Sequence, residues 1–518
     1  MLTIDELTKT IQRFANNGIS AVELDEAFLS YLDNNEEYRS KNACTLTQWF
    51  EGDLSGLLLP KFPYYYLSAY MKLTDKIDLM ERIVRLCVSD GSISKENKLY
   101  IYNQIVSYKF FYKRYDNDRV RDLLDELYEN IYKKYLNVTT DLTGHIAARD
   151  RNEDLIIIFI AQVLGLEHGP TKTLFDRAYI LQKKMNKRVF IVNTGDVVPQ
   201  GNSVPWFAAM GANYVDGYQE VDSLTYKDEQ FAFFQCPPEM PDISIIREIM
   251  TIVREEKPWF ILSLGSANIT ADLCARIVPT LTVNLGFSEL AETRSQFQAV
   301  GRALSDSDVK WMRKHSMPMD HYIESLFTFT LKPQTEHLTR EQLGIKPDVT
   351  VCIVIGGRLF AEIDDDFIRL ALRLGHVGIH VAFAGVFDNY DSFAEHYPEL
   401  RNTTYNLGFQ TDILAVCECC DIYVNPRRAG GGTSVVEAMY KGLPALTPNY
   451  GDVAKSAGED FCVDDYDDMY EQIIRLSNDR EYYNVMSEKS LNRAKVVMDS
   501  ETEFTRIINE MTSRESFF

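Results

Sequence analysis

The hydrophobic positions of the segment 1–140 recur at intervals of three and four, which predicts helices throughout this block. The spacing is clearest in residues 2–14 and 77–88. It returns in residues 106–136, where we expect one long amphipathic helix or a helix pair. No period of about 34 residues appears, so the pattern does not predict a solenoid. No cluster of histidine, cysteine or paired acids stands out, and we interpret the block as a packing or recognition domain.

After Asp154 the pattern changes from amphipathic helices to short, continuous apolar runs. Residues 155–160 are β-branched and aromatic, as in a strand buried on both faces of a parallel sheet. A predicted helix over 174–186 and a second strand over 188–193 complete a strand–helix–strand unit. Further strands are expected at 259–264 and 280–285. This alternation predicts a doubly wound α/β domain.

The loops that follow these strands are candidate ligand sites, because ligands collect at the carboxyl ends of parallel strands. Residues 265–268 and 286–288 are two such loops, and His168 follows the first strand. One interpretation of His168 is a loop histidine that bonds the backbone near a turn. The other is a cleft-facing group that binds an acceptor or a donor phosphate, or shuttles a proton near neutral pH. Lys172 could reach a phosphate, although surface lysines are more commonly solvated.

A second series of alternating elements begins after the polar, proline-punctuated connector 331–348. Its first strand, 349–355, leads into a Gly-Gly-Arg loop, and a charged helical tail, 476–518, is long enough to reach back to the other domain. We therefore predict an all-α domain (1–150), a Rossmann-like domain (151–335) and a second Rossmann-like domain with C-terminal helices (336–518).

The stretch 422–447 combines a strand, two arginines, three consecutive glycines and a helix opened by Thr433 and Ser434. Glycine-rich backbone at a helix N-terminus binds anions through exposed N–H groups and the helix dipole. Glu437 lies one turn into the helix, and at ~1.5 Å rise per residue its carboxylate is roughly one sugar's length from such an anion. Ribose hydroxyls would lie there if a diphosphate occupied the glycines. The stretch therefore predicts a nucleotide-sugar site.

Composition narrows the classes of partner. The 518 residues are too many for one core, and the net charge of −22 disfavours nucleic acid and polybasic membrane contacts. No apolar run is long enough for a transmembrane helix, and the N-terminus lacks a signal-peptide pattern. Nine scattered cysteines are typical of reduced thiols and a cytoplasmic protein. Cys417, Cys419 and Cys420 lack a second ligand pair at zinc spacing, which favours helix packing over metal binding.

Three segments resemble the C-terminal domain of glycosyltransferase family 4 (group 1): TREQLGIKPDVTVCIVIGGRL, YNLGFQTDILAVCECCDIYVNP and the glycine-rich stretch. The resemblance lies within the C-terminal half of the chain and implies a GT-B fold, in which two Rossmann-like domains face a cleft. The preceding half matches by element order, and the segment 1–150 does not match family 4. A helical domain before a GT-B pair is similar in architecture to bacterial cytosolic protein glycosyltransferases that modify adhesins, which makes a polypeptide acceptor an alternative worth testing.

Carried over by position, the resemblance implies a role for each matching residue. Arg358, after Gly357, would neutralise the donor phosphate, and Glu437 would bond the ribose. The other implied donor-binding residues are those of the nucleobase pocket and of the diphosphate loop: Gly408, Phe409, Thr411, Asp412, Gly430, Gly431, Gly432, Thr433 and Ser434. Arg358 and a helix N-terminus can disperse the charge of a nucleoside diphosphate leaving group, so we expect neither a metal nor a cofactor. The run Asp364 to Asp366 is expected to cap a helix.

Two departures from the family pattern leave alternatives open. The family usually carries a glutamate at the place of Ala429, and a lysine within the interval that residues 359–362 fill here. The leading hypothesis is a glycosyltransferase that uses a nucleotide sugar, with uridine expected as the nucleoside, and His168, Arg358 and Glu437 as its catalytic groups. The alternatives are an epimerase or phosphorylase of the same fold, and a non-catalytic subunit that binds a partner glycosyltransferase or an acceptor protein. The sequence leaves the sugar, the acceptor, the stereochemistry and the oligomeric state open.

Overall fold

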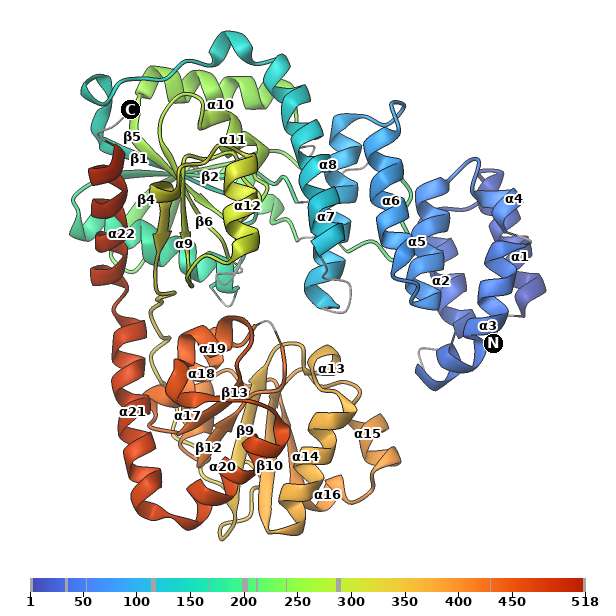
Figure 1. Cartoon of the computed structure of the whole chain (residues 1–518), viewed down its shortest axis with the longest axis vertical. Coiled ribbons are helices and arrows are strands. Elements are labelled where there is room, and N and C mark those ends of the chain that lie inside the picture. The colour runs from blue at the N-terminus through green and yellow to red at the C-terminus, as the bar shows by residue number, and fades with distance from the viewer. Residues whose placement is uncertain are drawn as a thin grey trace.

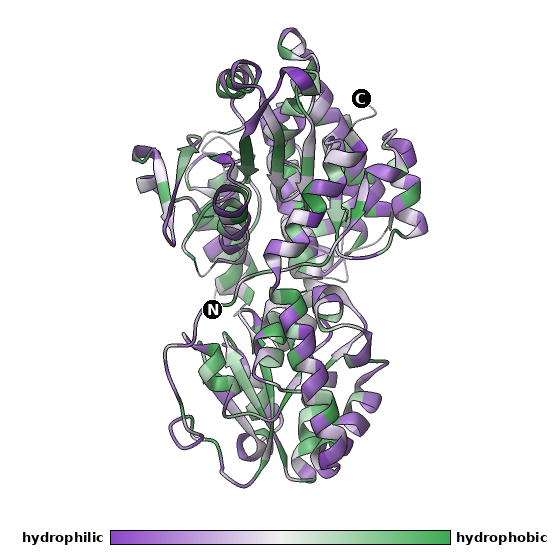
Figure 2. Ribbon diagram, turned by 90° about the vertical axis from the view of Figure 1, so that its left-hand side faces the viewer, coloured by the Kyte–Doolittle hydropathy of each residue, from purple (hydrophilic) through white to green (hydrophobic). Residues whose placement is uncertain are grey.

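The computed structural model describes the chain except residues 1–2, 33–35, 53, 113–117, 167, 198–203, 211–212, 239, 286–289, 429 and 516–518. Two lobes lie one above the other in Figure 1, and a row of helices extends sideways from the upper lobe. In Figure 2 the strands at the centre of each lobe are mostly apolar, whereas polar residues gather on the outer helices. None of the described helices is long and apolar enough to cross a membrane.

The N-terminal block is helical, as its hydrophobic spacing predicts. The helices pack side by side, α1 on α2, α5 on α6, and α8 on both α6 and α7. Their bounds are α1 Ile4–Ala15, α2 Ala21–Leu32, α3 Glu36–Glu51, α4 Ser55–Leu58, α5 Pro63–Thr74, α6 Asp78–Ser89, α7 Lys95–Phe111 and α8 Asp118–Asn137. The segment 106–136 contributes to two helices, α7 and α8, rather than to one. The row forms without a sequence repeat because each helix supplies its own apolar face.

The first Rossmann-like domain contains an eight-stranded sheet in the order β3-β4-β2-β1-β5-β6-β7-β8. The strands are β1 Asn152–Ile160, β2 Arg188–Asn193, β3 Ser223–Tyr226, β4 Glu229–Gln235, β5 Pro258–Leu264, β6 Thr280–Val283, β7 Phe297–Val300 and β8 Tyr322–Glu324. Its main helices are α9 Gly169–Tyr179, α10 Ile243–Glu256, α11 Ile269–Cys274 and α12 Asp306–Lys314. Among the described strands, β3 alone pairs antiparallel, at the sheet edge. Residues 155–160 are buried, as a central parallel strand requires.

The second Rossmann-like domain contains a parallel sheet in the order β11-β10-β9-β12-β13-β14. The strands are β9 Thr350–Gly356, β10 Ile379–Gly385, β11 Thr404–Gly408, β12 Ile422–Val424, β13 Ala445–Pro448 and β14 Cys462–Val463. The helices are α13 Leu359–Glu362, α14 Asp365–His376, α15 Tyr390–His396, α16 Leu400–Thr403, α17 Ile413–Cys417, α18 Gly432–Tyr440, α19 Gly451–Ala457, α20 Tyr466–Asn478 and α21 Arg480–Met498. Asp364 caps α14, as expected, by accepting a hydrogen bond from the Phe367 backbone N–H at 2.9 Å. These features confirm the predicted fold class, a GT-B architecture preceded by helices.

The helical block and the first Rossmann-like domain share a hydrophobic core, whereas the second Rossmann-like domain has its own. One core is continuous from the helical block to one face of the first sheet, where Ile157, Phe159 and Ile261 lie. The second Rossmann-like domain has a separate core. The helical block and the first Rossmann-like domain are therefore joined by a shared interior, whereas the second domain meets them through surface contacts.

The last helix, α22 Ser500–Glu515, returns to the first Rossmann-like domain. The sequence predicts it as part of the second Rossmann-like domain (336–518), but four of its side chains belong to the core on the other face of the first sheet: Phe504, Ile507, Ile508 and Met511. Figure 1 shows α21 along the lower lobe and α22 along the upper lobe. The reach predicted for residues 476–518 is confirmed.

Candidate functional site

The glycine-rich stretch forms the turn between β12 and α18. Gly431 adopts a φ of 98°, which favours glycine, and α18 begins at Gly432. A Cβ at Gly432 would lie 2.8 Å from Ser456 Oγ, so the turn packs closely against α19. Thr433 is exposed and Ser434 half-buried, and neither caps the helix with its side chain. The backbone N–H groups at the start of α18 are therefore left to the turn and to any anion that binds there.

Arg358 lies beside this turn, at the carboxyl end of β9. Its guanidinium is 3.1 Å from Glu362 Oε1, and a Cβ at Gly430 would lie 3.5 Å from Arg358 Nη2. The side chain is about one-third exposed. The structure thus brings together Arg358 and the glycine turn, two groups that the sequence predicted for the donor phosphates from segments far apart along the chain.

Arg428 differs from its neighbour Arg427, although the sequence offers both as a basic pair. Arg427 is exposed, and its guanidinium lies 4.9 Å from the Tyr450 ring centroid. Arg428 is buried and donates hydrogen bonds to Asn425 Oδ1 at 2.9 Å and to the Ile355 carbonyl at 2.6 Å. Arg428 therefore braces the base of the turn from inside the domain.

Glu362 receives both arginines. Its Oε2 accepts from Arg428 Nη1 at 2.7 Å, while Oε1 pairs with Arg358. The family usually carries a lysine within the interval that residues 359–362 fill here, and a glutamate at the place of Ala429. Here an acid stands near the first place and Arg428 stands next to the second, so the signs of the charges are exchanged. Ala429 itself lies outside the described residues.

Glu437 is half-buried in the second turn of α18. It lies close enough to Cys417 on α17 to help raise the pKa of that thiol, although burial is the main cause. All nine cysteines are unpaired thiols, and Cys417, Cys419 and Cys420 are buried. The predicted packing role of this cysteine cluster agrees with its position.

A cavity of about 310 Å³ opens at the carboxyl ends of β10 and β11. Of the four residues assigned to a nucleobase pocket, Gly408 and Phe409 line it. Its other walls are Gly385, Val386, Phe387, Asp388, Tyr390, Asp391 and Asn406. The segment 386–391 was missed because it matches no motif. Its position directly after a buried parallel strand is the signal that could have identified it.

Asp412, which the resemblance assigns to the nucleobase pocket, bonds the interdomain connector and the start of α17. Its Oδ2 accepts hydrogen bonds from the backbone N–H groups of Thr335 at 2.5 Å and Glu336 at 3.0 Å. Its Oδ1 caps α17 by accepting from the Ala415 N–H at 3.1 Å. Burial acts to raise the pKa of Asp412, but these donors outweigh it and lower the pKa. Asp412 therefore ties the interdomain connector to α17, while Thr411 is exposed beside it.

His168 is half-buried at the N-cap position of α9, close to the carboxyl end of β1. Its Nδ1 lies 3.0 Å from Thr171 Oγ1, which in turn accepts from the Leu164 N–H at 2.9 Å. Burial lowers the pKa of His168 below its ordinary value near 6.5. The imidazole is therefore neutral at pH 7 and oriented by Thr171, as a proton acceptor requires. Lys172 is half-buried in the next turn.

Side chains of the candidate loop 265–268 make hydrogen bonds within the first Rossmann-like domain. Asn268 is buried, caps α11 by accepting from the Ala271 N–H at 2.9 Å, and donates to Thr194 Oγ1 at 3.1 Å. Ser266 accepts from the Glu292 N–H at 2.8 Å. Residues 286–288, the second candidate loop, lie outside the described residues.

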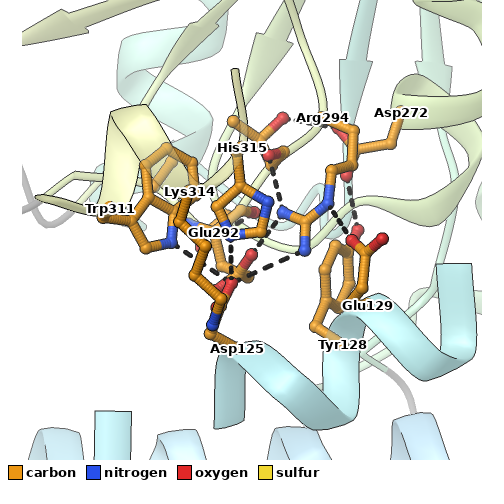
Figure 3. A network of polar contacts seen from close by, with 12 residues as sticks. Asp125, Tyr128, Glu129, Asp272, Glu292, Arg294, Trp311, Lys314 and His315 are labelled. Carbon is orange, nitrogen blue, oxygen red and sulfur yellow. Dashed lines mark hydrogen bonds and ion pairs between the residues drawn. The ribbon is translucent and has the colours of Figure 1, made fainter. Parts of the chain in front are cut away.

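A charged network joins the helical block to the first Rossmann-like domain (Figure 3). Arg294 is its hub: its Nε donates to Glu129 Oε2 on α8 at 2.8 Å, and its Nη1 pairs with Glu292 at 2.5 Å. Tyr128 on α8 donates to Asp272 on α11 at 2.6 Å. The network crosses the junction at several points, which adds directional contacts to the shared core.

Within the described part of the chain, one group of side chains has metal-ligand spacing: Asp125, Glu292 and His315. His315 Nε2 lies 2.7 Å from Asp125 Oδ1, and Lys314 pairs with the same carboxylate. Figure 3 shows His315 and Lys314 beside the Asp125 carboxylate. Because cationic side chains fill the approaches to this carboxylate, the group works as an ion-pair cluster.

Part of the second Rossmann-like domain is similar to a known protein family. Residues 339–493 match the model of the family described as glycosyl transferases group 1. No curated protein sequence matches. Similar solved structures include a glycosyltransferase from Rickettsia africae ESF-5, 11% identical, covering 69% of this chain and 98% of that chain, with a TM-score of 0.49. A Thermobaculum terrenum O-GlcNAc transferase mutant is 11% identical and covers 99% of this chain and 98% of its own, at 0.49. Anabaena Alr3699/HepE in complex with UDP and glucose is 14% identical and covers 70% and 100%, at 0.45.

Proposed function

Starting from a second Rossmann-like domain of the glycosyl transferases group 1 type, we propose that the chain is a glycosyltransferase that moves a sugar from a nucleoside diphosphate to an acceptor. The donor is a UDP-sugar, and the acceptor is a protein or a glycan on a protein. Transfer proceeds without a metal, because Arg358 and the N-terminus of α18 disperse the charge of the leaving diphosphate.

The observation that carries the proposal is the placement of Arg358 against the glycine turn. The guanidinium stands 3.5 Å from where a Cβ of Gly430 would be, so a phosphate over the turn would meet a cation and backbone N–H groups together. Glu437 follows one turn later, at the depth suited to ribose hydroxyls. These groups bind a nucleoside diphosphate as a set, which neither a lone helix end nor a lone arginine would do.

The cavity at β10 and β11 supports a nucleobase position. Its volume of about 310 Å³ lies within the range of small-molecule pockets. Phe409 is 66% exposed at its rim and can stack on a base, while Asp388 and Asn406 supply polar edges. We assign the base to this cavity and withdraw Asp412 from the set, because its carboxylate holds the connector.

Calorimetric titration with UDP, GDP and ADP tests the proposal, followed by hydrolysis assays with the corresponding nucleotide sugars. UDP is expected to bind, and Arg358→Ala and Glu437→Gln are each expected to lower its affinity by about 10-fold or more. Arg369→Ala is the matched control, because Arg369 is an exposed arginine on α14 that pairs with Asp366. If Arg358→Ala and Glu437→Gln bind UDP as tightly as the control Arg369→Ala, these residues do not form the nucleoside diphosphate site.

A second candidate is a non-catalytic subunit that binds a partner glycosyltransferase or acceptor protein. It is favoured by Ala429, which stands where the family usually places a glutamate near the transferred sugar. The neighbouring Arg428 also pairs with Glu362. UDP binding without any transfer or hydrolysis across a panel of UDP-sugars would support this candidate. We also propose a cytoplasmic location, supported by the nine unpaired cysteines.

A further inference from the structure

The last turn of α7 touches the donor side of the proposed site. The Phe110 ring lies over the guanidinium of Arg358, whose Cζ is 4.6 Å from the ring centroid. Figure 1 shows the C-terminal end of α7 directed toward the second Rossmann-like domain. Phe110 is 44% exposed and Val106, one turn earlier on the same face, is 38% exposed. An apolar face of the helical block thus borders the cation that the diphosphate would use.

Two side chains near the middle of α7 bond the first Rossmann-like domain. The Gln104 amide accepts from the Met210 N–H and donates to the Met210 carbonyl, both at 2.7 Å. Asn103 donates to the Asp196 carbonyl at 3.0 Å. Both partners lie in the chain that follows β2, and α7 also packs on α8, which carries the network of Figure 3. Phe110 therefore moves with the first domain, whereas Arg358 moves with the second.

The contact has consequences for charge as well as for packing. An aromatic face attracts a guanidinium, and the attraction strengthens as water is excluded from the contact. The ring also occupies space that water would otherwise fill beside Arg358, and a lower local dielectric strengthens the attraction between an arginine and a phosphate. Arg358 Nη2 also lies 3.1 Å from Glu362 Oε1. The guanidinium thus contacts a ring from one domain and a carboxylate from the other.

We propose that Phe110 is part of the nucleoside diphosphate site: it positions Arg358 over the glycine turn and shields the arginine from water when the domains are close. This inference rests on the proposed function and deepens it. The helical block is then a third wall of the donor site and not only a separate recognition module. Phe110 is a positioning residue, because it acts on the ligand through Arg358.

A double-mutant cycle read by UDP titration tests the inference. Phe110→Ala is expected to weaken UDP binding by about two- to fivefold, the scale of one partly exposed cation–π contact. Phe110→Tyr keeps the aromatic face and is expected to bind UDP within about twofold of the natural chain. In the Arg358→Ala background, Phe110→Ala is expected to change nothing further, because the ring acts through the arginine. Equal UDP affinity for Phe110→Ala and the natural chain overturns the inference, and so does an undiminished effect in the Arg358→Ala background.

Phe234→Ala is the matched control, since Phe234 is a phenylalanine on β4 with a similar exposure of 42%. It is expected to leave UDP affinity unchanged, and a loss as large as that of Phe110→Ala would attribute the effect to general packing and overturn the inference. Thermal melting of each variant verifies folding, which a partly exposed ring should not endanger. The two proposals fail differently. If the natural chain binds none of UDP, GDP and ADP, the proposed function and this inference fall together. If the natural chain binds UDP and Phe110→Ala binds equally well, only the inference falls.

Discussion

Replacing Arg428 by alanine should destabilise the second Rossmann-like domain, although the residue adjoins a ligand-binding turn. The guanidinium is buried and bonds Glu362, Asn425 and the Ile355 carbonyl. Removing one partner of a buried ion pair costs about 3–5 kcal/mol, because the remaining charge and acceptors stay desolvated. We expect a loss of about 4 kcal/mol, which lowers the melting temperature of a domain of this size by roughly 8–16 °C.

The chain offers a convenient assay for this loss. Its four tryptophans, Trp49, Trp206, Trp259 and Trp311, all precede the second Rossmann-like domain. Tryptophan fluorescence therefore reports the helical block and the first domain, whereas far-UV circular dichroism reports helices in all three parts. In Arg428→Ala, an early melting step is expected in circular dichroism without a matching step in fluorescence.

Arg427→Ala is the control for the Arg428 prediction. Arg427 is the adjacent arginine, but it is exposed over the Tyr450 ring, so its loss should cost no more than about 1 kcal/mol. Arg428→Lys keeps the charge but not the planar guanidinium, so its loss of stability should lie between those of Arg427→Ala and Arg428→Ala. If Arg428→Ala melts like Arg427→Ala and instead loses UDP affinity, Arg428 faces the ligand and the bracing role is refuted.

Three further perturbations test the roles of single side chains. Asp412→Ala should lower the free energy of unfolding by about 1–2 kcal/mol through the lost cap and speed protease cleavage at residues 332–338 of the connector; unchanged cleavage would refute the tether. Burial acts to raise the pKa of Asp125, but hydrogen bonds from His315 and Lys314 outweigh it and hold the pKa below its ordinary value of 3.8. The ionised Asp125 therefore stabilises the fold above pH 3.8, and this stabilisation is lost as the pH falls below that value. The stability gap between the natural chain and Asp125→Asn, measured by urea unfolding, should therefore shrink below about pH 4, and a constant gap would contradict the pairing. If His168 is the proton acceptor, transfer should fall only as the pH drops below 6.5, since burial lowers its pKa, and His168→Asn should abolish that limb of the pH–rate profile.

The periodicity of the sequence was sufficient to predict the architecture. Buried parallel strands such as 155–160 are continuous apolar runs, and three consecutive glycines identify the turn before α18. These features are local, so each can be recognised within a short window of sequence.

Roles set by tertiary contacts could not be predicted in the same way. Arg427 and Arg428 are adjacent and identical in type, yet one faces solvent and the other the core, because the chain reverses at the glycines. Asp412 belongs to a family motif, but its partners, Thr335 and Glu336, belong to a connector that precedes the whole second domain. Phe110 sits in a block without any functional motif. Its meaning depends on a domain contact that hydrophobic spacing does not encode.

The two segments that pass between the Rossmann-like domains run side by side. The Phe329 N–H donates to the Val497 carbonyl at 3.3 Å, and the Leu326 N–H donates to Glu503 at 2.7 Å. Two bonded segments at one edge form a hinge. The two Rossmann-like domains can rotate about the line of these segments more easily than they can twist or slide past each other. In Figure 1 this hinge lies beside α21 and α22, whereas the end of α7 lies on the opposite side. A rotation about this line would therefore change the separation of Phe110 and Arg358, which a fluorophore pair placed across that contact would measure.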